Sequence, residues 1–288
     1  MALPHLLLAL FTNIVWAFNF IAAKAGVEHF PPLLFTTMRF GILLLLILPF
    51  LRWVPGRMKG VLQIAFMLGI LHFGLVFAGI AASGDISSIA IATQLYVPFS
   101  ALLAVIFLDE RLDLPRLLGM SVAFAGVLVI GFDPIVLAHL KGLALIIAAA
   151  GAMAVATVLM RQVRAVGVIN LQAWIALIAT PGLGLLSWLF EHGQGEALRT
   201  ARWIDFSTPV YSAVGASLAG HGIVYYLLGR YPVSVTAPML LLAPVLAVFL
   251  GVTLWGDVLT WKLLLGGVMT LAGVGIITVW SGPEKVGS

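Results

Sequence analysis

The segment SIAIATQLYVPFSALLAVIFLDERLDLPRLLGMSVAFAGVLVIG (residues 88–131) recurs in related form as SVTAPMLLLAPVLAVFLGVTLWGDVLTWKLLLGGVMTLAGVGII (residues 234–277). Each copy is a pair of apolar runs joined by a short polar break. The copies align through a proline, an acidic loop residue and two spaced glycines, namely Pro98 with Pro244, Glu110 with Asp257, Gly119 with Gly266, and Gly126 with Gly273. Similar runs of apolar residues often match by chance, but this combination indicates that the second half of the chain repeats the first.

The composition of the whole chain predicts a membrane protein. Of its 288 residues, 62% are hydrophobic and only 9% are charged, and the mean hydropathy is +1.16. Soluble domains carry about 25% charged residues. The apolar residues also come in blocks of about 20, the length at which a helix crosses a hydrocarbon core of about 30 Å. The predicted fold class is therefore an all-α polytopic membrane protein.

Loop signals divide the apolar blocks into ten expected transmembrane helices. Their ranges are 3–24, 32–52, 60–82, 87–108, 115–132, 138–160, 168–190, 208–228, 233–254 and 261–281. The longest break, EHGQGEALRTARWIDF (191–206), has room for a short interfacial helix. We expect a first five-helix repeat at 1–134, a second at 135–282, and a disordered cytoplasmic tail at 283–288.

Each expected repeat has an odd number of spans, so the second repeat must enter the membrane in the opposite orientation. Inverted repeats form two bundles related by a pseudo-two-fold axis in the membrane plane, with the substrate near the midplane. The expected fold is thus ten transmembrane helices, arranged as two inverted five-helix repeats around a central cavity. This architecture is typical of transporters that work by alternating access.

The basic residues predict the orientation in the membrane. With both termini in the cytoplasm, nine lie on the cytoplasmic side, namely Arg52, Arg57, Lys59, Arg111, Arg116, Arg161, Arg164, Arg230 and Lys285. Five lie on the opposite side, namely Lys24, Lys141, Arg199, Arg202 and Lys262. Because basic loops resist translocation, this asymmetry favours a multi-pass protein of the cytoplasmic membrane with both termini cytoplasmic.

Polar side chains within the spans are the candidate binding residues, because polar groups in hydrocarbon are costly and usually face protein or water. His72 in LHFGLVFAG (71–79) and His221 in GHGIVYYLL (220–228) occupy equivalent points of the third and eighth spans, which favours a shared cavity over simple packing. The expected substrate-binding residues are Asn13, Trp16, Asn19, Thr37, Arg39, His72, Gln94, Tyr96, Met153, Trp174, His221 and Tyr225. The paired prolines Pro98 and Pro244 are predicted hinges, since each removes a helical hydrogen bond.

Several of these residues have a second interpretation. Trp174 lies near the start of its span and is compatible with the interfacial aromatic belt. Arg39 is the one strongly charged side chain within a predicted span, and it is compatible with snorkelling to the interface. The Gly-spaced fifth and tenth spans are expected to pack together by close approach, as a scaffold or dimer surface, which leaves a monomer or a weak homodimer open.

The residues that are missing limit the mechanism. All 11 Asp and Glu residues fall in loops or at span ends, whereas carboxylates within spans are the usual carriers of proton or sodium coupling. We therefore expect transport without strict ion coupling, with His72 and His221 as the remaining candidate proton carriers. With Arg39 as the one cation available in a span, phosphate-bearing substrates are disfavoured.

Other classes of protein have little support in the sequence. The chain has no cysteine, which excludes disulfides and thiolate metal sites, and no metal or cofactor is expected. No G-x-S-x-G or H-E-x-x-H motif supports an intramembrane enzyme. A channel or a receptor-like protein remains an alternative to a carrier. The expected partners are a small-molecule substrate and the lipid bilayer, and no nucleic acid.

Three segments resemble a known family over essentially the whole chain. They are TNIVWAFNFIAAKAG (12–26), PPLLFTTMRFGILLLL (31–46) and the duplicated P…LDERL…G…AG block (98–126). They resemble the drug/metabolite transporter superfamily, in its ten-helix EamA-type branch. The resemblance implies a ten-helix carrier with cytoplasmic termini and a central cavity, usually exporting amino acids or related metabolites.

Within that branch, the set of aromatic and histidine residues is similar to that of bacterial aromatic amino acid exporters. Asn13, Trp16 and Asn19 stand where small four-helix multidrug relatives depend on a glutamate, which argues against proton-driven multidrug export. The expected function is a secondary transporter of aromatic and other apolar amino acids. The alternative is an exporter of other small metabolites or drugs, with proton coupling through histidine.

Overall fold

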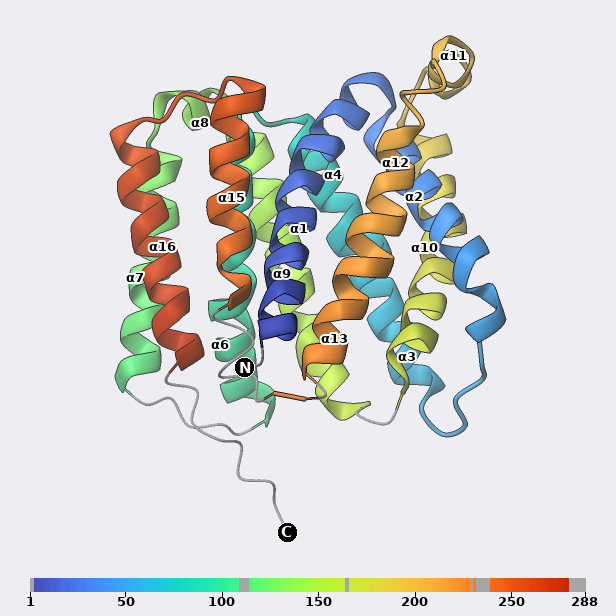
Figure 1. Ribbon diagram of the computed structural model, residues 1–288, viewed down its shortest axis with the longest axis horizontal. Coiled ribbons are helices and arrows are strands. Elements are labelled where there is room, and N and C mark those ends of the chain that lie inside the picture. The colour runs from blue at the N-terminus through green and yellow to red at the C-terminus, as the bar shows by residue number, and fades with distance from the viewer. Residues whose placement is uncertain (1–2, 109–113, 164–165, 229, 232–238, 280–288) are drawn as a thin grey trace.

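The computed structural model describes residues 3–108, 114–163, 166–228, 230–231 and 239–279, and within these ranges its regular structure is helical (Figure 1). The first half contains α1 (Leu3–His29), α2 (Pro32–Ile47) with η1 (Leu48–Phe50), α3 (Met58–Ala65) with η2 (Phe66–His72) and α4 (Phe73–Ala81), α5 (Ile86–Ala92) with η3 (Thr93–Leu95) and α6 (Tyr96–Leu108), α7 (Leu114–Gly131) and the short α8 (Pro134–Ala138). The second half contains α9 (Leu140–Gln162), α10 (Val168–Phe190), the short α11 (Gln194–Thr200), α12 (Ser207–Tyr211) with η4 (Ser212–His221) and α13 (Gly222–Leu228), α15 (Leu242–Leu250) with η5 (Gly251–Trp255), and α16 (Trp261–Val279).

These helices form a multi-pass membrane protein. Eight runs in the described ranges are long and apolar enough to cross a bilayer, and Leu242–Trp255 is a shorter apolar run. The run from α12 to α13 adds a further crossing between residues 207 and 228. Large apolar side chains point outward, including Leu45 at 76% exposure and Val268 at 66%. Such a surface suits lipid, which accepts apolar groups at no cost.

The crossings alternate in direction. In Figure 1, α1 begins and α16 ends at the lower edge, whereas α8 and α11 lie at the upper edge. The first half therefore starts at the lower edge and ends at the upper one, and the second half runs the other way. The loop between α2 and α3, which carries Arg52 and Arg57, lies at the lower edge, and Lys59 follows in the first turn of α3.

The most extensive contacts between the halves are made by two helix pairs in the described ranges. α7 packs along α16, and α2 packs along α10. A Cβ added at Gly126 of α7 would lie 2.6 Å from the Gly266 carbonyl oxygen of α16, so the two backbones touch because both residues lack a side chain. The glycine spacing of the fifth and tenth spans thus predicts this contact.

The other helices pack in matching ways in the two halves. α1 lies against α15 and η4, and its counterpart α9 lies against α6, η2 and α4. The helix that opens each half thus contacts the third and fourth spans of the other half. This arrangement brings the middles of α1, α2, η2 and η4 together around the candidate site.

Breaks in helical geometry also occur at matching positions. The π-helical segments η2 and η4 end at His72 and His221, respectively. Single π turns within α-helices are frequent at functional sites. The 3₁₀ segment η3 ends just before α6, which contains Pro98. Because proline has no N–H, Pro98 gives the Gln94 carbonyl oxygen no helical donor. Pro244 in α15 likewise gives none to the carbonyl oxygen of Leu240, which precedes that helix.

Candidate functional site

The central feature of the site is a buried guanidinium on α2. Arg39 is 2% exposed, and its Nε and Nη2 donate hydrogen bonds to the Ser217 hydroxyl oxygen on η4, at 3.2 and 2.8 Å. The Arg39 Cζ lies 4.5 Å from the ring centroid of Phe73 and 5.4 Å from that of Phe77. No described carboxylate is paired with Arg39. A buried cation that is solvated by one hydroxyl and aromatic faces is ready to bind an anion, because an unpaired charge is costly to bury.

The two predicted histidines lie beside this cation. His72 Nδ1 is 2.8 Å from the Ala149 carbonyl oxygen, and His221 Nδ1 is 2.9 Å from that of Ala216. A carbonyl oxygen only accepts, so each Nδ1 carries a proton and donates it. Arg39 interacts electrostatically with both imidazoles, and His221 interacts with His72. In the neutral rings, each Nε2 is then the acceptor nitrogen.

Helix α1 adds an aromatic and an amide to the same region. Trp16 Nε1 donates to the Ala216 carbonyl oxygen at 3.2 Å, and its ring centroid is 5.2 Å from that of His221. Asn19 Oδ1 accepts a hydrogen bond from the Ser212 hydroxyl at 2.6 Å. A Cβ at Gly220 would lie 2.9 Å from the Trp16 Cδ1, so glycine at this position of η4 lets the indole approach the helix.

The remaining predicted residues surround this group or lie apart from it. Asn13 Nδ2 donates to the carbonyl oxygens of Ala9 and Met239, at 2.7 and 2.9 Å, while its buried Oδ1 has no partner among the described residues. Thr37 donates to the Leu33 carbonyl oxygen one turn earlier, at 2.8 Å.

Tyr96 and Met153 are half-buried against two separate apolar clusters, and Gln94 is half-buried in η3. The side chain of Tyr225 lies outside the described part of the structure. Trp174 lies at the lower end of the bundle, where its Nε1 donates to the Arg52 carbonyl oxygen at 3.0 Å and its ring meets that of Trp53 edge to face at 6.0 Å. The structure thus brings together Trp16, Asn19, Arg39, His72 and His221, and places Trp174 elsewhere.

Two kinds of residue at the site were not among the predicted set. Ser217 lies one turn before His221, and this spacing is the signal that could have identified it. Phe73 and Phe77 carry no such signal, because an aromatic residue that faces a cation looks in sequence like any other core residue.

The upper end of the bundle is closed by buried polar contacts between distant segments. Asp257 Oδ2 accepts three hydrogen bonds from the start of α5: from Ile86 N at 3.0 Å, Ser87 N at 2.8 Å and Ser87 Oγ at 2.6 Å. Lys24 Nζ donates to the carbonyl oxygens of Ile80 and Ser83, at 3.1 and 2.8 Å. These contacts join α1, α4, α5 and the segment before α16.

Asp85 caps α5 by accepting a hydrogen bond from Ser88 N at 2.6 Å. Burial raises the pKa of its carboxyl group, although the hydrogen bonds from Ser88 act in the opposite direction.

Acidic residues gather at the upper end of the bundle. In the described ranges they are Glu28, Asp85, Asp133, Glu191, Glu196, Asp205 and Asp257. In the part of the chain that the structure describes, the carboxylates are thus found at the upper end.

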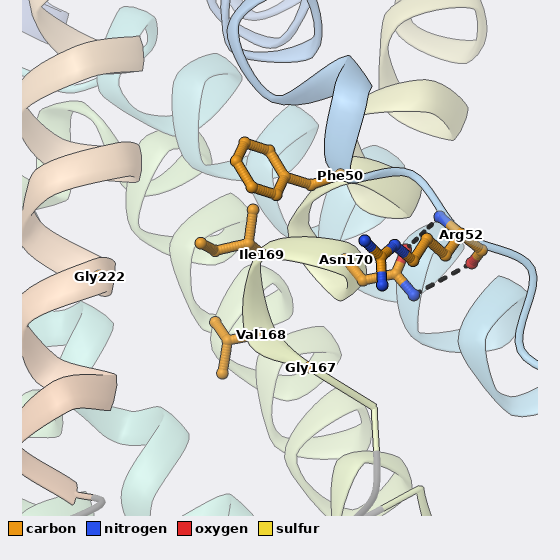
Figure 2. Close-up of a pocket in the computed structure, with 7 residues that line it drawn as sticks. All are labelled: Phe50, Arg52, Gly167, Val168, Ile169, Asn170 and Gly222. Atoms are coloured by element: carbon orange, nitrogen blue, oxygen red, sulfur yellow. Dashed lines mark hydrogen bonds between the residues drawn. The ribbon is translucent and has the colours of Figure 1, made fainter.

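A cavity of about 590 Å³ opens at the lower end (Figure 2). It is lined by Phe50, Arg52, Gly167, Val168, Ile169, Asn170 and Gly222. A second cavity, of about 390 Å³, lies at the upper surface between the α1–α2 turn and α11. The predicted binding residues line neither cavity. They form a packed group between the two, and Gly222 adjoins His221 in sequence.

A bundle of crossing helices with an unpaired guanidinium and two imidazoles at its middle, and no described carboxylate there, is the arrangement of a small-molecule transporter. The chain belongs to the EamA-like transporter family, whose profile matches residues 3–132 and again residues 140–279. The recognition of an EamA-type transporter from the sequence is thereby confirmed.

The chain is similar to two proteins named "Probable amino-acid metabolite efflux pump". The one from Salmonella typhimurium is 32% identical over 93% of this chain and 92% of that protein, and the one from Escherichia coli is 28% identical over 98% of each. It is also similar to "Uncharacterized transporter YoaV" of Bacillus subtilis, at 22% identity over 95% of this chain and 96% of that protein. A crystal structure with a TM-score of 0.62 and 18% identity, covering 96% of each chain, shares the fold.

Proposed function

We propose that this membrane transporter exports amino acids, chiefly aromatic and other apolar ones, across the cytoplasmic membrane. The observation that carries the proposal is the buried, acid-free guanidinium of Arg39, held by Ser217 from the other half of the chain. A guanidinium in a low-dielectric site binds a carboxylate through charge-assisted hydrogen bonds. Two similar proteins are named as amino-acid metabolite efflux pumps, which supports the same substrate class.

The surroundings of Arg39 favour a substrate with an apolar side chain. Phe73 and Phe77 present their rings to the cation, and Trp16 packs against the His221 ring. Aromatic pairs contribute about 0.5–1.5 kcal/mol beyond the burial of area. The acceptor Nε2 of each imidazole suits the ammonium group of an amino acid. Specificity is expected to be broad, because one methylene changes binding by about 1–3 kcal/mol.

The mechanism that we propose is alternating access without strict ion coupling. The halves 1–134 and 135–282 act as inverted repeats, Pro98 and Pro244 act as hinges, and the basic lower edge faces the cytoplasm. In the described ranges, the carboxylates lie at the upper end and none approaches Arg39. The central site therefore offers no carboxylate to carry a proton or a sodium ion.

A counterflow screen tests this function. Purified protein in liposomes that are preloaded with one unlabelled amino acid is expected to take up labelled phenylalanine or leucine with no imposed ion gradient. Uptake should saturate and should depend on the internal substrate, which separates a carrier from a channel. Absence of counterflow for all amino acids would refute the substrate class.

One observation favours the alternative, an exporter of other small metabolites with proton coupling through histidine. Nδ1 of His72 and of His221 donates to a backbone carbonyl oxygen, so a proton taken up by either neutral ring would go to Nε2. Under this alternative, a pH gradient alone should drive uphill accumulation, and replacement of both histidines by Gln should abolish it. Our proposal expects counterflow to persist when the gradient is collapsed.

A further inference from the structure

The cavity at the lower end lies between the start of α10, η1 and α13. Figure 2 shows Phe50, Val168 and Ile169 projecting into the space in front of the helix that carries Gly222. Gly167 and Gly222 add no side chains to its walls, and a Cβ built at either one would meet no atom within 4 Å. We call this cavity the access cleft. Its volume of about 590 Å³ has room for an amino acid with water.

One helical run carries both a wall of the access cleft and residues of the candidate site. Gly222 follows His221 directly, and it lies five residues, or about 7 Å along the helix axis, beyond Ser217, which binds Arg39. At the upper end, buried contacts of Asp257 and Lys24 join neighbouring segments, and neither residue lines the upper cavity. The lower cavity, with the greater volume of the two described above, is therefore the candidate for a path to the site.

The mouth of the access cleft carries an exposed cation on an anchored segment of backbone. The Arg52 backbone is held at three points: its N–H donates to Asn170 Oδ1 at 2.8 Å, and its carbonyl oxygen accepts from Asn170 Nδ2 and Trp174 Nε1, each at 3.0 Å. Figure 2 shows the Arg52 side chain turning back toward Asn170. Within the described ranges no carboxylate pairs with its guanidinium, so the charge remains available to an anion.

We propose that the access cleft is the water-filled path from the cytoplasm and that Arg52 is the first contact for the carboxylate of an amino-acid substrate. Arg39 is then the second contact, roughly 20 Å from Arg52 along the axis of η1 and α2. Two cations in series hold an anion at the mouth and at the midplane, and neither is neutralised by a described acid. The substrate class and the cytoplasmic side rest on the function proposed above, whereas a water-filled path at the basic-loop side does not.

The absence of cysteine from the chain makes the path directly testable. Gly222 has ordinary helical φ and ψ angles and open space around its Cα, so Gly222→Cys is expected to fold and to carry a single thiol. In membrane vesicles, a charged, impermeant thiol reagent is expected to modify this cysteine from the basic-loop side. Val214→Cys, a 41% exposed position on the same helical run, is the lipid-facing control and should react chiefly with a lipid-soluble maleimide.

The outcomes separate water from lipid in the access cleft. Modification of Gly222→Cys by the charged reagent from the basic-loop side, slowed by added phenylalanine, supports the path and its occupant. Reaction with the lipid-soluble maleimide alone would show a lipid-filled groove and overturn the proposal, as would modification from the opposite side alone. This readout does not depend on transport, so it stands even if the counterflow screen fails for every amino acid.

The role of Arg52 has its own test. Arg52→Gln keeps the backbone contacts to Asn170 and Trp174, and it is expected to raise the half-saturating phenylalanine concentration about two- to five-fold on the basic-loop side only. Arg57→Gln, an exposed residue of the same loop that does not line the access cleft, is the matched control and should have no effect. Equal effects of the two variants, or no effect of Arg52→Gln, would refute the first-contact role.

Discussion

The contact between Asp257 and the start of α5 is predicted to be a main source of stability at the upper end. Asp257 is 8% exposed, and its Oδ2 accepts hydrogen bonds from Ile86 N, Ser87 N and Ser87 Oγ. Two of these donors are N–H groups in the first turn of a helix, which have no partner within the helix. Asp257→Ala removes the acceptor for all three donors.

The size of the effect follows from these donors. A buried donor left without an acceptor costs about 1–3 kcal/mol. With two backbone donors, and with the Ser87 hydroxyl free to rotate, the expected loss in unfolding free energy is about 2–4 kcal/mol. At about 2–4 °C per kcal/mol, the apparent Tm falls by about 5–15 °C. Asp257→Asn keeps one carbonyl oxygen as an acceptor and should cost about half as much.

Thermal unfolding of the purified protein in detergent, followed by intrinsic fluorescence, measures this loss. Asp205→Ala is the matched control, because Asp205 lies on the same side of the bundle and pairs with Arg202, whose side chain is 77% exposed. We expect the control to lower the Tm much less, since the Asp205 carboxylate contacts the exposed Arg202 and such exposed contacts contribute little. Equal Tm values for Asp257→Ala and Asp205→Ala would show that the reasoning about buried donors is wrong.

Two further predictions concern packing and pH. In α7, Gly126→Ala would place a Cβ 2.6 Å from the Gly266 carbonyl oxygen, so α7 and α16 must separate and the unfolding free energy should fall by about 1–3 kcal/mol. The control is Gly151→Ala in α9, where an added Cβ meets no atom within 4 Å and the effect should be neutral or slightly stabilising. A higher Tm for Gly126→Ala than for Gly151→Ala would contradict the packing. Burial raises the pKa of Asp85 above its ordinary value of 3.8, so the folded protein binds this proton more tightly than the unfolded chain, and stability should fall as the pH rises from about 4 through the raised pKa. Asp85→Asn keeps a capping side chain and should flatten this part of the Tm–pH curve, and an unchanged slope would refute the assignment.

The sequence predicted the helices well, because their signal is local. The expected span 168–190 coincides with α10, and the expected interfacial helix in 191–206 is present as α11. The first span was expected to end at residue 24, but α1 continues to His29. It continues because the Lys24 ammonium finds acceptors inside the protein, at Ile80 and Ser83, and does not need to reach water.

The site was less predictable, because its contacts join residues that are far apart in the chain. Arg39 and Ser217 are separated by 178 positions, and no local pattern indicates that one solvates the other. The π-helical segments that end at His72 and His221 also leave no periodic signal in an apolar run. Trp174 shows the limit most clearly: its residue type suits a binding site and a membrane interface equally, and only the contact with Arg52 places it at the lower end.

The most direct test is to compare the binding of phenylalanine with that of phenethylamine, the same molecule without its carboxylate, to the purified wild-type protein and to Arg39→Met. Methionine replaces a buried charge by an apolar side chain of similar length, a change that proteins often tolerate. We predict that the wild-type protein binds phenylalanine about 10-fold or more tightly than the amine, as expected for a charge-assisted hydrogen bond, and that this ratio falls to near one in Arg39→Met. A ratio that is unchanged by the substitution would contradict the assignment of Arg39 as the carboxylate anchor.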